Sequence, residues 1–183
     1  MIIGITGTNG SGKDVAAKYF MKSGFSFYSL SDIIRRECEN RGLSKDRDSL
    51  ILMGNSLRKN NGPSILAKLT MDLIKERKED LVIVGSIRHE KEAKELAKHP
   101  EFKLIAIDAP IEKRFERVKK RLSEMDDVTF EKFRRQEKSE MKGHESHMET
   151  LHSVINMADE FIVNDSTIDD FHSKLANVLS QRK

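Results

Sequence analysis

The stretch GTNGSGKD, residues 7–14, combines three glycines and a lysine at a spacing that suits phosphate binding. Gly7, Gly12 and Lys13 follow the pattern G-x-x-x-x-G-K, in which the glycines let successive backbone amides converge on one phosphate. Lys13 adds a full positive charge, and the helix that follows directs the positive end of its dipole to the same point. The loop therefore predicts a site for the polyphosphate of a nucleotide. The expected contact residues are Gly7, Thr8, Asn9, Gly10, Ser11, Gly12, Lys13, Asp14 and Val15.

Asp14 stands where most such loops carry a serine or threonine that binds Mg²⁺ through its hydroxyl. A carboxylate is a hard oxygen ligand, so Asp14 could hold magnesium directly or through water. A second departure supports this interpretation, because Gly85 and Ser86 follow the apolar run at 81–84 where a metal-binding aspartate usually stands. The alternative is that Asp14 merely caps its helix, since aspartate is favoured at a first turn. Both interpretations of Asp14 stay open from the residues alone.

Five short apolar runs must position these residues, and longer stretches with helical periodicity separate them. The runs cover residues 1–5, 25–30, 81–84, 104–107 and 161–163. Strands that alternate with helices are typical of a parallel sheet covered on both faces. We therefore predict an α/β fold, a three-layer sandwich with a five-stranded parallel sheet, in a single domain over residues 1–183.

The composition narrows the class of protein. Of 183 residues, 37% are apolar and 34% are charged, which allows one core beneath a heavily solvated surface. The net charge of +3 is too small to indicate a nucleic-acid partner. The single cysteine, Cys38, excludes an internal disulfide and favours a reducing compartment. Because no apolar run could span a bilayer and no signal peptide precedes the first strand, we expect a cytoplasmic protein without membrane or nucleic-acid partners. Its oligomeric state stays open.

The stretch YSLSDIIR, residues 28–35, is similar to the acceptor-site stretch of adenylate kinases. Together with the loop, it makes the chain resemble the P-loop nucleoside and deoxynucleoside monophosphate kinases, close to the dephospho-coenzyme A kinases. The resemblance implies that Arg35 binds the acceptor's phosphate. It also aligns Asp32 with an aspartate that, in dephospho-coenzyme A kinases, assists the attacking hydroxyl. From the residues alone, Ser31 or Asp32 could equally be the N-cap of a helix.

The stretch LVIVGSIRHEKEA, residues 81–93, matches the same family at Arg88, Glu92 and Ala93. An arginine just beyond the carboxyl end of a strand faces the crevice where such sheets bind ligands. Its guanidinium can form paired hydrogen bonds with phosphate oxygens. We therefore expect Arg88 to act in catalysis and in acceptor binding.

The segment DAPIEKRFERVKKR, residues 108–121, resembles the part of adenylate kinases that follows their fourth strand. In that family an ERxxxR pattern places one arginine near the adenine and another on the phosphates. Arg117 and Arg121 match this pattern at a spacing of four, which puts both on one helix face. The stretch VNDS, residues 163–166, is similar to the loop on the base side of these kinases and adds Asn164 to the expected ATP contacts.

The charged segment DDVTFEKFRRQ, residues 126–136, resembles the far side of the family's lid. The resemblance implies that Arg134 or Arg135 reaches the phosphate in transfer. It also places a helical acceptor-binding insert at about 31–78 and a short lid at about 121–143. This lid lacks zinc-binding cysteines and resembles that of dephospho-coenzyme A kinases, whereas phage deoxynucleotide monophosphate kinases share the SGKD loop.

These features predict an ATP- and Mg²⁺-dependent small-molecule kinase whose acceptor is a nucleotide, with a nucleoside or deoxynucleoside monophosphate expected first. The expected catalytic residues are Lys13, Asp32, Arg88 and Arg121. One alternative is a dephospho-coenzyme A kinase, in which a ribose hydroxyl is the target and Asp32 matters more than Arg35. An alternative of another class is a nucleotide-dependent switch or regulatory ATPase, whose slow hydrolysis would not respond to an acceptor.

Overall fold

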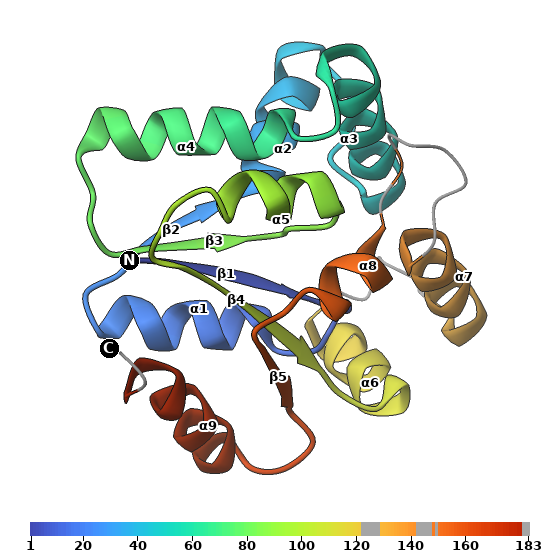
Figure 1. The fold of residues 1–183 in the computed structure, drawn as a ribbon. Coiled ribbons are helices and arrows are strands. Elements are labelled where there is room, and N and C mark those ends of the chain that lie inside the picture. The colour runs from blue at the N-terminus through green and yellow to red at the C-terminus, as the bar shows by residue number, and fades with distance from the viewer. Residues whose placement is uncertain (122–128, 142–147, 149, 181–183) are drawn as a thin grey trace.

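A five-stranded parallel sheet runs through the centre of the computed structural model, which describes residues 1–121, 129–141, 148 and 150–180 (Figure 1). The strands are β1 (Ile2–Gly7), β2 (Ser26–Ser29), β3 (Val82–Gly85), β4 (Phe102–Asp108) and β5 (Glu160–Val163). Neighbouring strands pair in parallel in the order β2-β3-β1-β4-β5. The predicted sheet is therefore confirmed, and each strand begins and ends within two residues of its expected run.

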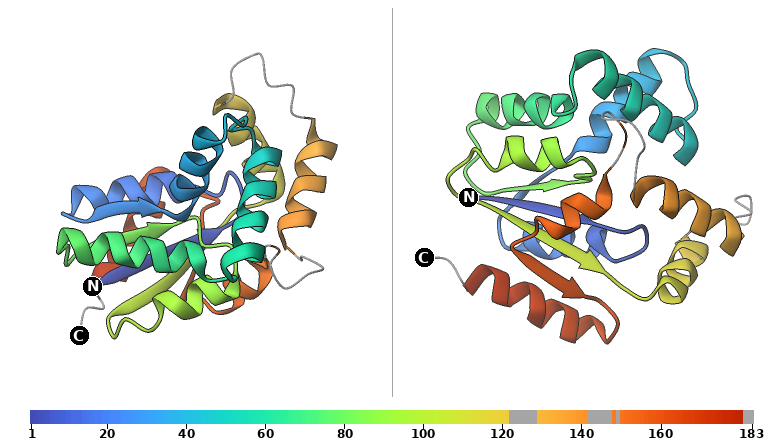
Figure 2. Two further views of the ribbon diagram at one scale, coloured as in Figure 1. Left: turned by 90° about the horizontal axis from the view of Figure 1, so that it is seen from above. Right: turned by 45° about the vertical axis from the view of Figure 1, so that its right-hand side comes forward.

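Helices cover both faces of the sheet. In chain order they are α1 (Lys13–Lys22), α2 (Leu30–Asn40), α3 (Arg47–Asn61), α4 (Ile65–Arg77), α5 (Glu90–Leu96), α6 (Ile111–Arg121), α7 (Phe130–Met141), α8 (Leu151–Asn156) and α9 (Ile168–Ser180). Helices α1 and α9 lie on one face, whereas α4, α5 and α8 lie on the other (Figures 1 and 2). The three-layer arrangement is thus the predicted one. Among the described residues, no helix has the length and apolarity needed to cross a membrane.

Each central strand contributes to two cores because successive side chains point to opposite faces of a sheet. Ile2, Val82 and Val84 pack with the α4 and α5 layer. Ile3 and Ile83 pack with the α1 and α9 layer. Burial on both faces explains why the strands read as near-continuous apolar runs in the sequence.

The strand order places the functional elements at one end of the sheet. After β1 the chain crosses to β2 and β3 on one side, and later to β4 and β5 on the other. Ligands bind in the crevice outside the carboxyl ends of the strands, where the strand order reverses. Helices α3, α6 and α7 lie around this end (Figure 1). Of the expected lid, α7 is described, whereas residues 122–128 and 142–143 lie outside the described residues.

Candidate functional site

The phosphate loop, residues 7–14, joins β1 to α1 by a path that requires glycine at two positions. Gly7 has φ 131° and Gly12 has φ 105°, both in the left-handed region. A Cβ atom on Gly7 would lie 1.9 Å from the backbone oxygen of Ile107, and one on Gly12 would lie 2.3 Å from the side-chain nitrogen of Asn164. The two glycines of the motif therefore let the backbone curl tightly against neighbouring segments.

Lys13 opens α1 in a positively charged environment. Burial and then the charge of Arg88 are the largest causes that lower the pKa of Lys13 from 10.5 to about 7. Arg47 also lowers this pKa, whereas the carboxylates of Asp14 and Glu140 raise it. A bound anion would stabilise the charged form of Lys13 and so raise its pKa again.

The donors of the loop fit a polyphosphate. The ammonium of Lys13 donates a hydrogen bond to the backbone oxygen of Thr8. This contact keeps the positive charge of Lys13 close to the other residues of the loop. Ser11 is completely buried, and its hydroxyl has no hydrogen-bond partner among the residues that the structure describes. Gly12 is the N-cap of α1, and no side chain caps this helix. A phosphate held here would satisfy the Ser11 hydroxyl and the amide groups of the first helical turn.

Asp14 lies in the first turn of α1, two residues after the N-cap Gly12, so it is not the N-cap itself but stands where a carboxylate interacts favourably with the helix dipole. Its side chain is 74% exposed and forms an ion pair of 3.0 Å with Arg121 at the end of α6. Within the described ranges, no three or more His, Cys, Asp or Glu side chains gather into a metal site. A magnesium ion would therefore rely on Asp14, water and nucleotide phosphates, a set that suits its preference for few carboxylates and several waters.

The end of β3 carries hydroxyls where P-loop proteins usually carry a carboxylate. The Ser86 hydroxyl lies 2.8 Å from that of Ser29, which lies 2.8 Å from that of Ser31. The Arg35 guanidinium donates to the Ser31 hydroxyl, so the end of β3 faces hydroxyls and an arginine in place of a carboxylate.

Asp108, at the carboxyl end of β4, is a functional candidate that sequence reasoning missed. It accepts hydrogen bonds from the Thr8 hydroxyl and from the Ala109 amide at 2.8 Å, and its Oδ1 lies 3.3 Å from Nε of Arg114. Since β4 lies directly beside β1, the end of one strand supports the loop that follows the other. The available signal was an acidic residue directly after the apolar run at 104–107.

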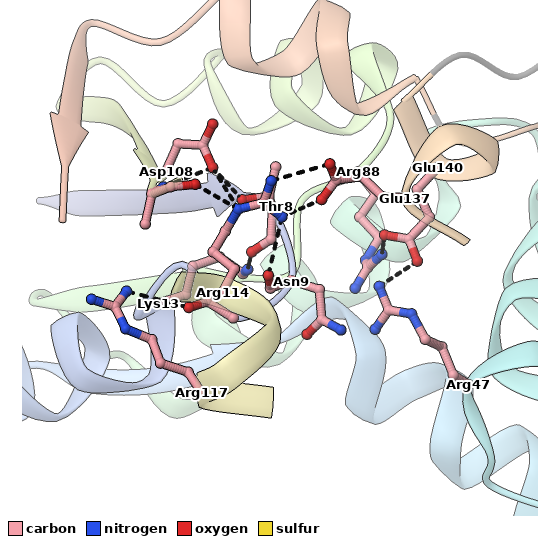
Figure 3. A network of polar contacts seen from close by, with 12 residues as sticks. Thr8, Asn9, Lys13, Arg47, Arg88, Asp108, Arg114, Arg117, Glu137 and Glu140 are labelled. Carbon is pink, nitrogen blue, oxygen red and sulfur yellow. Dashed lines mark hydrogen bonds and ion pairs between the residues drawn. The ribbon is translucent and has the colours of Figure 1, made fainter. Parts of the chain in front are cut away.

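Arg114 is a second missed residue, and it is almost completely buried. Its Nε donates to the backbone oxygen of Ala109 at 2.6 Å, and its Nη1 lies 3.4 Å from that of Asn9 (Figure 3). The same guanidinium pairs with Glu137 on α7. Arg114 thus connects the phosphate loop with α6 and α7. The signal in the sequence was its spacing of four from Val118, the other buried residue of α6.

Arg117 and Asn164, both expected on the nucleotide side, lie against the phosphate loop. Arg117 donates from Nη2 to the backbone oxygen of Asn164 at 2.9 Å and from Nη1 to that of Gly10 at 3.4 Å. The Asn164 side chain donates to the backbone oxygen of Ser11 at 2.8 Å, and its backbone amide donates to that of Asp108 at 2.8 Å. Two segments far apart in the sequence therefore meet at the loop.

Arg88 joins two further residues that sequence reasoning missed. Its Nη1 donates to Oε2 of Glu140 on α7 at 2.7 Å, and the other oxygen of this carboxylate pairs with Arg47, the first residue of α3 (Figure 3). The Glu140 side chain is only 2% exposed. Arg47 and Arg88, the arginine pair, thus hold a buried carboxylate that is near enough to Lys13 to affect its pKa.

One face of α7 explains why Glu140 is buried. Phe130, Phe133, Glu137 and Glu140 follow one another at spacings of three and four, which places them on the same side of a helix. Phe115 of α6 contacts both aromatic rings, at centroid distances of 5.2 and 5.7 Å. The aromatic half of this face packs on α6, and its acidic half reaches the arginines. This spacing was the signal that could have identified Glu140.

Arg134 and Arg135, the expected lid arginines, are exposed on α7. They line a cavity of about 620 Å³ together with Lys138, the acidic Glu131 and Glu137, and the apolar Ile111 and Met141. Three basic and two acidic side chains leave this lining with only a small positive excess.

Arg35 and Asp32 lie together on the outer side of α2. Arg35 Nη1 donates to Asp32 at 3.1 Å and to the Ser31 hydroxyl at 2.5 Å, and the Asp32 side chain is 63% exposed. The N-cap of α2 is Ser29, so the interpretation of Ser31 or Asp32 as the cap is wrong. The structure joins Arg35 to its own helix, whereas the sequence had grouped it with Arg88.

Glu92 fixes the backbone from which the Arg88 side chain extends. One oxygen of its carboxylate accepts hydrogen bonds from the amides of Arg88 and His89, each at 3.0 Å. The other oxygen pairs with Nε of Arg58 on α3 at 2.9 Å, and both side chains are 0% exposed. His89 caps α5 in a capping box with Glu92. The match at Glu92 in the sequence therefore corresponds to a structural anchor for Arg88.

With this geometry established, sequence comparison gives the family. A family profile described as an AAA domain matches residues 3–152. A UPF0200 protein of Pyrococcus abyssi is 36% identical over 176 residues, which cover 93% of this chain and 91% of the relative. The chain belongs to the UPF0200 family. This assignment to UPF0200 specifies no substrate.

Solved structures show the same fold as this UPF0200 chain. A protein of Thermus thermophilus is 20% identical with a TM-score of 0.67, covering 100% of this chain and 98% of its own. Shikimate kinase of Acinetobacter baumannii, solved with shikimate, is 13% identical with a TM-score of 0.59, covering 100% and 95%. The fold is therefore that of a P-loop kinase. The closer resemblance to nucleoside monophosphate kinases stays a prediction.

Proposed function

We propose that the chain is an ATP-dependent kinase that transfers the γ-phosphoryl group to a small nucleotide, most simply a nucleoside or deoxynucleoside monophosphate. The observation that carries the proposal is the proximity of Lys13 in the phosphate loop to the arginine pair. Arg88 and Arg47 both pair with the carboxylate of Glu140, and the charges of all three residues act on Lys13, so one charged site can serve two anionic groups. Phosphoryl transfer requires such an arrangement, because the phosphates of donor and acceptor must be held side by side.

On the donor side, the loop amides and Lys13 would hold the β- and γ-phosphates of ATP. Arg117 and Asn164, which contact the loop, would support the nucleotide end. Mg²⁺, when bound, would neutralise charge on the phosphates. Asp14 would hold the ion directly or through water, and Arg121, its ion-pair partner, would add positive charge at the phosphates.

On the acceptor side, Arg88 would bind the phosphate of the acceptor from the end of β3. Arg35 and Asp32 would contact the acceptor from α2, where their exposure leaves them accessible. Arg134 or Arg135 would approach from α7, which lies at the same end of the sheet. These charges would neutralise the phosphoryl group in transfer and exclude water on closure.

One observation favours a second acceptor, dephospho-coenzyme A. The Asp32 carboxylate is exposed, and its one ion pair among the described residues is with the exposed Arg35 side chain, so it could accept a proton from a ribose hydroxyl. In that case Asp32→Asn would reduce turnover far more than Arg35→Gln. A monophosphate acceptor predicts the reverse order.

The proposal is tested by measuring ADP release from ATP and Mg²⁺ with a panel of nucleoside monophosphates, deoxynucleoside monophosphates and dephospho-coenzyme A. We expect at least one acceptor to accelerate ADP release and to appear as a phosphorylated product. A Lys13→Met variant serves as the control for contaminating kinases. Slow hydrolysis that no acceptor accelerates would instead identify a switch or regulatory ATPase.

A further inference from the structure

A buried carboxylate fills the space between two arginines at the proposed acceptor side. Glu140 bridges Arg47 and Arg88 with its two oxygens, and its side chain is 2% exposed. The three residues come from α7, α3 and the segment after β3, which lie far apart in the sequence. Two guanidinium groups that converge on one anion form the geometry that also binds phosphate oxygens.

Three basic groups act on one another around Glu140. The charges of Arg47 and Arg88 both disfavour the charged form of Lys13. A phosphate monoester carries close to two negative charges and three acceptor oxygens, so it can accept more charge-assisted hydrogen bonds from two guanidinium groups than one carboxylate can.

The position of Glu140 in α7 allows its release without loss of the helix. Phe130 and Phe133 anchor the first half of α7 on Phe115, and Glu137 remains paired with Arg114. Glu140 is the second-last residue of α7, beyond these anchors. Only the last turn would need to move for the carboxylate to leave the arginine pair.

We propose that the arginine pair is a binding site for the phosphate monoester of the acceptor, and that Glu140 is an internal anion which this phosphate displaces. That this phosphate belongs to the acceptor of a kinase reaction rests on the proposed function. The inference adds Arg47 to Arg88 as a second arginine on this phosphate, while Arg35 would contact the acceptor from α2. It also selects the substrate class, because a monophosphate supplies the displacing group at this position and a nucleoside does not.

An ordinary buried ion pair is the competing explanation, and it makes the opposite prediction. If Glu140 only stabilises the fold, then Glu140→Gln should lower stability without increasing affinity for any anion. If Glu140 competes with phosphate, the same substitution should strengthen phosphate binding because the internal competitor is neutral.

Calorimetry can separate these cases when the phosphate loop is filled first. The full chain is titrated with a non-hydrolysable ATP analogue and Mg²⁺, and failure of this step would count against the proposed function alone. Inorganic phosphate, a nucleoside monophosphate and the matching nucleoside are then titrated into the filled protein. We expect Glu140→Gln to raise affinity for phosphate and for the monophosphate at least about tenfold, and to leave the nucleoside unchanged. Arg47→Gln should weaken both phosphate-bearing ligands at least tenfold.

Glu137→Gln is the matched control, since it neutralises a carboxylate on the same face of α7 that pairs with Arg114 instead. Its phosphate affinity should stay within about twofold of the unmodified chain. Equal or weaker phosphate binding by Glu140→Gln would overturn the inference. If phosphate strengthened but the monophosphate did not, the site would bind free phosphate and its assignment to the acceptor would be wrong.

Hydrogen exchange on the unmodified chain tests the displacement without any substitution. Phosphate at saturating concentration, with the loop filled as above, should accelerate amide exchange in the last turn of α7. Amides of residues 130–134, near the aromatic anchor, should keep their rates. Unchanged or slower exchange in the last turn would show that Glu140 stays between the arginines.

Discussion

The hydroxyl of Thr8 in the phosphate loop donates a hydrogen bond to the carboxylate of Asp108, one hundred residues later in the chain. The contact is possible because β1 and β4 are neighbours in the sheet and end at the same edge. This hydrogen bond makes the conformation of the phosphate loop depend on β4, a strand that lies outside the loop's sequence motif.

Replacing Asp108 with alanine should therefore loosen the phosphate loop. The substitution removes an acceptor from the Thr8 hydroxyl and from the Ala109 amide, so we expect the free energy of unfolding to fall by about 1–3 kcal/mol. Affinity for ATP should fall with it. Urea unfolding and ATP titration measure the two effects. Asp108→Asn keeps an acceptor oxygen and should lose less stability than alanine; a larger loss would contradict this explanation.

Arg88 should contribute strongly to turnover. Removing one preorganised charge that faces the transferring group costs about 2–4 kcal/mol of transition-state stabilisation, or roughly 30- to 1,000-fold in kcat/KM. Steady-state kinetics of Arg88→Gln with the best acceptor provide the measurement. Arg41→Gln is a suitable control, because Arg41 pairs with Glu37 on the exposed side of α2. A loss below threefold in Arg88→Gln would refute the role.

ATP binding should take up a proton above neutral pH. The pKa of Lys13 is lowered to about 7, so the amine is increasingly neutral as pH rises through this value. Phosphate favours the ammonium form and raises the pKa, so affinity should decline from pH 7 towards 9, by about tenfold per unit at most. Calorimetry in buffers of different ionisation enthalpy measures the proton uptake.

Lys13→Arg provides the control for this effect. Arginine stays protonated throughout the range, so its proton uptake from this position should vanish. Equal uptake in both proteins would assign the proton to another group.

Asp14 should determine the magnesium requirement. If its carboxylate helps to hold the ion, Asp14→Ala should raise the Mg²⁺ concentration for half-maximal activity by about tenfold or more. Arg121→Gln removes the ion-pair partner but keeps the carboxylate, so it should not raise that concentration. An unchanged magnesium dependence in Asp14→Ala would leave only an interaction with the helix dipole.

Local patterns predicted the parts of the site that depend on neighbouring residues. Gly7, Gly12 and Lys13 define the loop by their spacing, and the strand before Arg88 placed this residue at the crevice. The phosphate loop and Arg88 each follow directly after a strand, and an apolar run followed by polar residues is visible in the sequence.

The remaining contacts depend on segments that meet only in the folded chain. Glu140 reaches Arg47 across 93 positions and Arg88 across 52. No spacing rule relates residues so far apart, and in a segment dense in charge Glu140 looks like any solvated acid. For Arg35, the motif predicts a shared acceptor site with Arg88, and the structure shows an exposed ion pair with Asp32 on the same helix, so its role stays a prediction.

The Glu92 anchor has a kinetic consequence. Because this carboxylate holds the amides of Arg88 and His89, the Arg88 side chain can change partners only by rotation about its own bonds. Such rotations take picoseconds to nanoseconds in accessible side chains, whereas helix ends and loops rearrange over nanoseconds to microseconds. We therefore expect the movement of α7, which is slower than the rotation of the Arg88 side chain, to determine the residence time of an anion at Arg88.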